Sequence, residues 1–164
     1  MFILPKDFDE ENPREFPLTK VRYQQYRNYL ESIADKLPPS AREFALADWR
    51  LDFTDHRCPH DSWVEHLKIF EEATGERREI RTAHIEVKLL GAYHDGYLDL
   101  KYKNVHAYSL AKSAQYGDCH GDWLYDEVRL SENGRVLHEI EFWLKADWLI
   151  ECEDIEFAWT PSES

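Results

Sequence analysis

Two histidines, a cysteine and two aspartates crowd into one ten-residue stretch, which is TDHRCPHDSW from Thr54 to Trp63. His56, Cys58 and His60 are each two residues apart, so an extended backbone would place all three side chains on one side. Pro59 favours an extended conformation at Cys58. Imidazole and thiolate are ligands that zinc prefers. The stretch is therefore either a metal site or a polar loop between two strands.

A zinc site would need a further ligand, and the other loop with matching chemistry is Ala111–Asp122, which contains His120. The spacing of His56, Cys58 and His60 matches none of the usual zinc patterns, such as C-x-x-C or H-E-x-x-H. We therefore expect no metal and no cofactor. If the protein does bind a metal, the expected ligands are His56, Cys58, His60 and His120. His56 and His60 are expected to bond backbone or water.

A second pair of ionisable residues is found through the register of a predicted hairpin, LYDEVRLSENGRVLHEIEF. A three-residue loop that ends at Gly134 is a common hairpin closure. It places Leu130 opposite Val136 and sets four pairs in all, the others being Val128 with His138, Asp126 with Ile140, and Leu124 with Phe142. The apolar residues then share one face, and Asp126 and His138 lie on that face as diagonal neighbours.

A carboxylate and an imidazole that point into a core are costly unless they are paired. Asp126 and His138 could be a buried structural pair, the polar lining of a cavity, or a catalytic acid and base. The structural interpretation is favoured because such pairs also occur in ordinary cores. No nucleotide-binding loop, nucleophile elbow or kinase motif is present in the sequence.

Charge indicates the kind of partner. The 164 residues carry a formal net charge of −13, and residues 118–164 hold 13 acidic residues against Arg129, Arg135 and Lys145, a balance of −10. A surface of this sign disfavours nucleic acid and anionic membranes and suits a protein with a basic surface. Aromatic residues make up 14% of the chain, and aromatic side chains often anchor protein interfaces. The expected partner-binding residues are Trp123, Glu139, Glu141, Trp143, Glu151 and Glu153.

Three cysteines are too few for a disulfide framework and favour a reducing cytoplasm. The first residues, MFILPKDFDEENP, lack the basic and apolar regions of a signal peptide, and no apolar run is long enough to span a membrane. We expect a cytoplasmic protein.

The elements that must position these residues form one domain, 1–164. Residues 1–17 are expected to be an extended arm, 18–37 a helix capped by Thr19 and ended by Pro38, and 44–159 an antiparallel sheet. The segment Phe44–Phe53 is ambiguous. Ser40 and Glu43 match a helical capping box, but the alternation that follows favours a strand, which we adopt.

Strands that follow one helix predict an α+β fold, with a curved antiparallel sheet or partly open barrel of about seven to nine strands. The sequence favours a non-enzymatic binding module for a protein partner. The alternative is a small-molecule-binding protein or metal-dependent enzyme with a pocket around Asp126 and His138. In composition alone the chain resembles many bacterial immunity and adaptor proteins, which transfers no residue roles.

Overall fold

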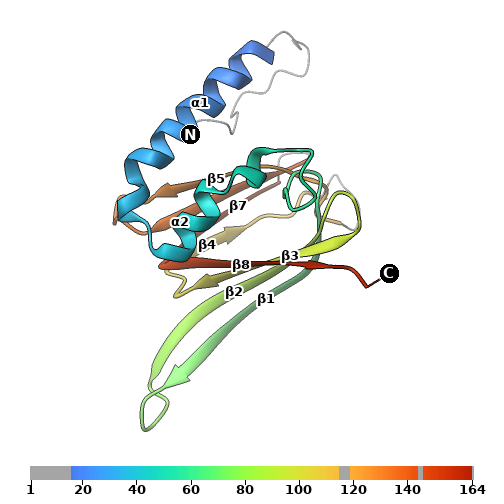
Figure 1. The fold of residues 1–164 in the computed structure, drawn as a ribbon. Helices are drawn as coiled ribbons and strands as arrows, with labels where there is room; N and C mark the ends of the chain where they lie inside the picture. Colours follow the sequence, from blue (N-terminus) through green and yellow to red (C-terminus); the bar gives the residue numbers. More distant parts are fainter. Residues whose placement is uncertain (1–15, 115–118, 144–145, 164) are drawn as a thin grey trace.

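The computed structural model describes residues 16–114, 119–143 and 146–163. They form two α-helices, two short 3₁₀-helices and eight strands (Figure 1). The helical elements are α1 (Phe16–Ile33), η2 (Ala34–Lys36), α2 (Pro39–Leu46) and η3 (Asp48–Leu51). The strands are β1 (Trp63–Thr74), β2 (Ile80–Leu90), β3 (Gly96–Lys103), β4 (Ala107–Leu110), β5 (Trp123–Leu130), β6 (Val136–Phe142), β7 (Ala146–Cys152) and β8 (Asp154–Pro161).

The strands form two antiparallel four-stranded sheets, here named sheet A and sheet B. Sheet A has the order β1-β2-β3-β8, and sheet B has the order β4-β7-β6-β5. The predicted α+β class, the antiparallel pairing and the number of strands are confirmed, but the sheets do not close into a barrel.

The core lies between the inner faces of the two sheets and is completed by the helices. Alternate residues of β2 and β3, including Ile85, Val87 and Leu100, are buried from sheet A, and Ile140 and Trp148 are buried from sheet B. This is the alternation expected of strands with one face in a core.

Helix α2 joins the two sheets through its apolar side. Ala41, Phe44 and Ala45 are buried, a spacing of three and four residues that places them on one side of a helix. The Phe44 ring lies 5.5 Å from that of Phe157 in β8 and 5.7 Å from that of His138 in β6. Figure 1 shows α2 beside β8.

The predicted strand Phe44–Phe53 is wrong. Residues 44–46 end α2 and residues 48–51 form η3, so the sheet begins at Trp63 rather than at residue 44. The capping-box signal indicated the right type of element, although Ser40 lies inside the helix and Pro38 takes the cap position without a side-chain hydrogen bond.

Helix α1 begins at Phe16, within the expected arm and three residues before the proposed cap Thr19, and ends at Ile33. Its buried residues Tyr26, Leu30 and Ile33 recur at spacings of three and four and so lie on one side of the helix. Residues 1–15, which make up most of the expected N-terminal arm, lie outside the described residues. No helix in the described part of the chain is long and apolar enough to cross a membrane.

Helix α1 and the segment that follows α2 also cover the free edge of β5. In an edge strand, every second residue directs its backbone N–H and C=O outward. The outward groups of β5 belong to its even-numbered residues, and each of these residues has at least one outward group that is bonded to a side chain. The pairs are Leu124 O with His60, Asp126 O with Arg50, Val128 N and O with Tyr26, and Leu130 N with Tyr29.

Candidate functional site

The residues singled out as a possible acid–base pair are part of a buried polar cluster between the sheets. His138 Nε2 lies 2.8 Å from Asp126 Oδ2, and His138 Nδ1 lies 2.9 Å from the hydroxyl of Tyr102 in sheet A. Arg50, from η3, forms an ion pair with the same carboxylate oxygen of Asp126. Trp123 Nε1 donates to the other carboxylate oxygen at 3.3 Å. All of these side chains are buried.

The partners fix the protonation states within the cluster. Burial alone would raise the pKa of Asp126, but the positive charge of Arg50 and the hydrogen bond from His138 outweigh it and hold that pKa below its usual value. Burial lowers the pKa of His138; its hydrogen bond to Asp126 opposes this effect, and the nearby charge of Arg50 adds to it. Burial keeps the pKa of Tyr102 well above its usual value. Neutral His138 therefore donates from Nε2 to Asp126 and accepts from the Tyr102 hydroxyl at Nδ1.

This arrangement pairs every charge and leaves no route for a substrate. The exposed fraction is 3% for Asp126, 1% for Arg50 and 0% for His138 and Tyr102. A general acid or base must come within hydrogen-bond reach of the substrate. The cluster instead links η3, sheet A and sheet B, which is the role of a structural polar network.

The sequence located this cluster through the hairpin register. The predicted pairs Leu130 with Val136, Val128 with His138 and Asp126 with Ile140 are confirmed. The predicted pair of Leu124 with Phe142 is wrong: the register shifts between Trp123 and Tyr125, and Phe142 lies opposite Trp123. This irregularity turns the Trp123 side chain into the core.

Sequence reasoning missed Arg50, which supplies the countercharge of the cluster. In the structure, η3 turns Arg50 inward, where its guanidinium also donates to Ala45 O. The signal that could have found it is the buried carboxylate itself, because an ionised Asp126 in a core requires a cationic partner.

The histidine-rich loop does not bring its three candidate ligands together. His56 Nδ1 lies 2.5 Å from Asp95 Oδ2, and its ring stacks on Tyr93. The Cys58 thiol is buried and donates to Arg50 O, and burial raises its pKa to about 12. His60 Nδ1 donates to Leu124 O at 2.6 Å. The expectation that His60 bonds backbone is confirmed, whereas His56 bonds a carboxylate.

The two loops that carry the proposed ligands do meet at one end of the sheets. Trp123 N donates to Ser62 O, and Trp63 Nε1 donates to Asp122 Oδ1 at 2.7 Å. His120, however, packs against the rings of Phe142 and Trp148. Within residues 16–114, 119–143 and 146–163, no group of three or more histidine, cysteine or carboxylate side chains is placed to hold a metal ion.

Three of the four carboxylates proposed as partner contacts, Glu139, Glu141 and Glu151, lie on the outer face of sheet B, the face turned away from sheet A. Alternation along the strands assigns this face three rows of side chains. The rows are Arg129, Leu137, Glu151 and Ala107; Glu127, Glu139, Leu149 and Ser109; and Tyr125, Glu141 and Asp147. Arg129 forms ion pairs with both Glu127 and Glu139.

Five of the six predicted partner-binding residues are accessible. Glu139, Glu141 and Glu151 are half-buried on this face, Glu153 is exposed just beyond β7, and Trp143 is 44% exposed at the end of β6. Trp123 is fully buried and packs on Phe142, so it is not an interface residue, and its place on the predicted list is corrected.

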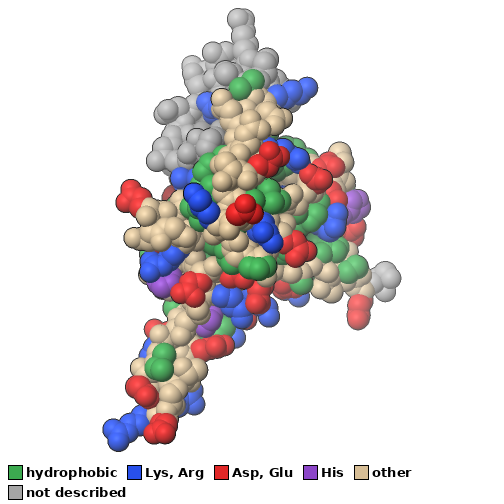
Figure 2. Space-filling model, turned by 60° about the vertical axis from the view of Figure 1, so that its left-hand side comes forward, with side chains coloured by type: hydrophobic (Ala, Val, Ile, Leu, Met, Phe, Trp, Pro, Cys, Tyr) green, Lys and Arg blue, Asp and Glu red, His purple; other side chains and the backbone are tan. Residues whose placement is uncertain are grey.

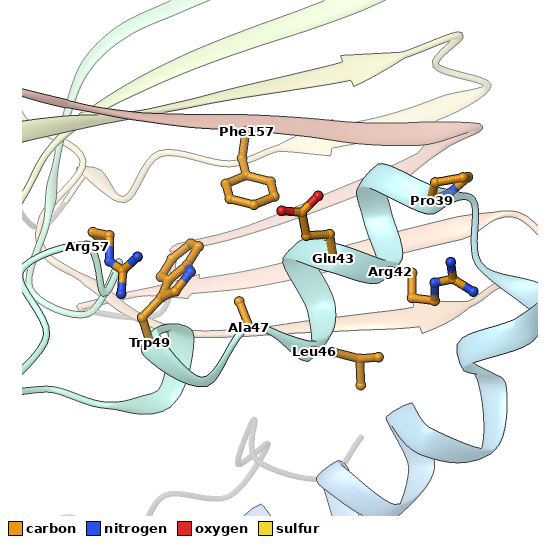
Figure 3. A pocket seen from close by; sticks show the side chains of 8 residues that line it. All are labelled: Pro39, Arg42, Glu43, Leu46, Ala47, Trp49, Arg57 and Phe157. Carbon is orange, nitrogen blue, oxygen red and sulfur yellow. The ribbon is translucent and has the colours of Figure 1, made fainter.

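An open groove of about 650 Å³ lies on another side of the molecule, between α2, η3 and β8 (Figure 3). Its aromatic part consists of Trp49 and Phe157, whose ring centroids are 5.6 Å apart, and Arg57 lies over the Trp49 ring. Because Asp55 already binds the Arg57 guanidinium through two hydrogen bonds, this end of the groove is largely neutralised. Asp126 and His138 do not line the groove.

Comparisons of the chain with protein-family models, with curated proteins and with solved structures found no match.

Proposed function

We propose that this chain is a non-enzymatic, cytoplasmic binding module that engages a protein with a basic surface through the outer face of sheet B. Catalysis at the Asp126–His138 pair is disfavoured because that pair is enclosed and fully bonded. The outer face of sheet B, in contrast, offers carboxylates together with exposed apolar surface. Leu149 is 37% exposed within the face, and Trp143 borders it.

The observation that carries this proposal is that like charges lie directly opposite one another on that face. Glu127 is opposite Glu139 across β5 and β6, and Glu141 is opposite Asp147 across β6 and β7. Such cross-strand pairs destabilise a sheet. Arg129 offsets the first of these pairs through its ion pairs with both acids, and a cationic partner would further reduce the repulsion on this face.

The chemistry of the face defines the partner. Carboxylates around Leu149 and Trp143 suit a basic surface with an apolar centre, in which lysine or arginine meets the acids and an apolar side chain meets the aromatic ring. The same charge would repel nucleic acid and anionic membranes.

Charge reversal on this face tests the proposal. The double variant Glu141→Lys/Asp147→Lys keeps like charges opposite each other, so this pair should contribute similarly to stability while the charge of the face inverts. The matched control, Glu31→Lys/Asp35→Lys, makes the same change in net charge at exposed positions of α1 and η2.

Capture from a lysate of the source cells should recover a basic partner with the wild type and the control, and the yield should fall by about tenfold or more with the face variant. High salt should also release the partner, because steering and rim contacts are screened. Equal recovery by the wild type and the face variant would exclude this face as the binding surface.

A further inference from the structure

The four edges of the two sheets are protected to different degrees. The edge of β5 is covered by side chains from α1, from η3 and from the loop before β1, and β8 lies against α2, where Ala41 N donates to Asp154 Oδ1. Strand β4 is only four residues long. Strand β1 is twelve residues long and pairs on one side with β2, and among the described strands none pairs with its other side. Long open edges of this kind are templates for pairing with another chain.

The outer half of β1 is also the least supported part of sheet A. Strand β3 pairs with β2 only from Ile85 onward, so the residues from Phe70 to Thr74 and from Ile80 to His84 form a two-stranded ribbon. Figures 1 and 2 show this hairpin projecting from the body, with acidic and basic side chains along it. Ile69 is 44% exposed and Ile80 is 57% exposed. A two-stranded ribbon alone is marginally stable in water.

We propose that β1 pairs with β1 of a second copy of this chain, antiparallel and in a register centred on Phe70. Each Phe70 then lies opposite its symmetry mate, and the paired stretch runs from His66 to Thr74. The two hairpins together make a four-stranded sheet, β2-β1-β1-β2, from two ribbons that each lack a neighbour.

The charges along β1 select this register. Centred on Phe70, it places Lys68 of each copy opposite Glu72 of the other, which gives two ion pairs by symmetry. A register centred on Lys68, Glu71 or Glu72 places that charged residue opposite the same residue of the other copy, and two like charges facing each other are unfavourable. One centred on Ile69 places Lys68 opposite Phe70, so Lys68 has no carboxylate opposite it.

Both charges are available for a partner. The side chain of Lys68 is 52% exposed, with its nearest carboxylate, Glu86, at 3.8 Å. The side chain of Glu72 is 60% exposed, with the imidazole of His84 at 3.6 Å. These intramolecular contacts are long and can be exchanged for contacts across a twofold axis.

A twofold pairing also explains why this open edge need not lead to aggregation. An antiparallel pair of identical strands is isologous, so each copy uses its β1 edge once and the assembly closes as a dimer. Because the interface is small, we expect a concentration-dependent equilibrium rather than a permanent dimer.

Sedimentation equilibrium over a range of protein concentrations, combined with a charge swap, tests the proposal. The wild-type mass should rise from the monomer value of 19.6 kDa toward twice that value. Lys68→Glu and Glu72→Lys should each weaken dimerisation by about tenfold, which corresponds to ~1.4 kcal/mol. The double variant Lys68→Glu/Glu72→Lys should restore the dissociation constant to within about threefold of the wild-type value.

The matched control is Lys103→Glu/Glu156→Lys, which swaps a similar exposed pair, at 3.7 Å, at the opposite edge of sheet A. It should leave the dissociation constant unchanged. Thermal unfolding of each variant checks that the monomer still folds. A wild type that stays monomeric at all concentrations, or single variants that dimerise as well as the wild type, would overturn the proposed interface. Single variants that are weakened but not rescued by the double variant would overturn the Phe70-centred register.

Discussion

At the scale of single residues, Asp126 shows how a buried charge is accommodated in this core. Its carboxylate forms an ion pair with the guanidinium of Arg50 and accepts hydrogen bonds from the imidazole of His138 and the indole N–H of Trp123. A buried ion pair seldom adds much net stability, because both charges lose their hydration. Its effect is to fix geometry: the three donors come from η3, β6 and β5, so correct bonding requires all three elements to be in place.

We expect Arg50→Met to destabilise the protein by ~3–5 kcal/mol, because it leaves the carboxylate of Asp126 buried without its cation. The double variant Arg50→Met/Asp126→Leu should be more stable than Arg50→Met alone, since it removes the uncompensated charge as well. Urea unfolding at pH 7 measures both free energies of unfolding.

The two side chains would not be energetically coupled if the loss of stability in the double variant equalled the sum of the losses in Arg50→Met alone and Asp126→Leu alone. The conservative variant Arg50→Lys serves as the control. It keeps a positive charge but not the fork of donors that reaches Asp126 and Ala45, so it should fall between the wild type and Arg50→Met.

The sequence was sufficient to find Asp126 and His138 but not Arg50 or Tyr102. The first two are joined by a local hairpin whose turn chemistry and alternation set the register. Arg50 is 76 residues from Asp126, and Tyr102 is 36 residues from His138. Such contacts depend on how η3 and sheet A pack on sheet B, which no local pattern encodes.

At the scale of elements, the contrast between the edges of β5 and β1 is the informative feature. Val128 donates its backbone N–H to the hydroxyl of Tyr26 at 2.6 Å, and the same hydroxyl donates to Val128 O at 3.2 Å. Burial raises the pKa of this phenol to about 12, which keeps its proton available for that second bond. One tyrosine of α1 thus replaces the neighbouring strand that β5 lacks.

Tyr26→Phe should therefore destabilise the protein by ~1–3 kcal/mol, because it leaves a buried N–H and C=O of Val128 without partners. Amide hydrogen exchange at Val128 should accelerate in step with the loss of stability. Tyr29→Phe is the matched control. The Tyr29 hydroxyl accepts from Leu130 N in a half-buried position, where water can take its place, so its effect should be smaller. Equal effects of the two variants would contradict a special role for Tyr26.

The element that the sequence mispredicted, residues 44–53, failed for an identifiable reason. Apolar residues alternate through Ala45, Ala47 and Trp49, but α2 ends at Leu46 and η3 begins at Asp48. A short helix followed by a turn into a 3₁₀-helix can produce an alternating pattern without a strand. The capping signal at Ser40 and Glu43 indicated the correct type of element over this stretch, although not its first residue. Two short elements joined by a single residue lie below the length at which periodicity is decisive.

At the scale of the whole molecule, the outer face of sheet B sets two pairs of acids directly opposite each other. Glu141 and Asp147 lie directly opposite each other on adjacent strands of sheet B, and Glu127 and Glu139 do the same one row away. Arg129 bridges the second of these pairs. Neighbouring strands of sheet A show the opposite arrangement, with Lys68 opposite Glu86 and Lys101 opposite Glu156. The two sheets therefore differ in how far their cross-strand pairs favour the folded monomer.

This difference predicts that stability and binding change in opposite directions at one residue. Asp147→Lys places a cation opposite Glu141, and it should stabilise the isolated protein by roughly 0.2–1 kcal/mol. Asp147→Asn, which only removes the repulsion, should give a smaller gain. Both variants should weaken the complex with a basic partner if the outer face of sheet B is the binding surface, and the lysine variant should weaken it more. Thermal unfolding at low salt measures the first effect, which should shrink as added salt screens the charges. If the lysine variant were less stable than the wild type, Asp147 would support the fold, and the inferred repulsion between Asp147 and Glu141 would be wrong.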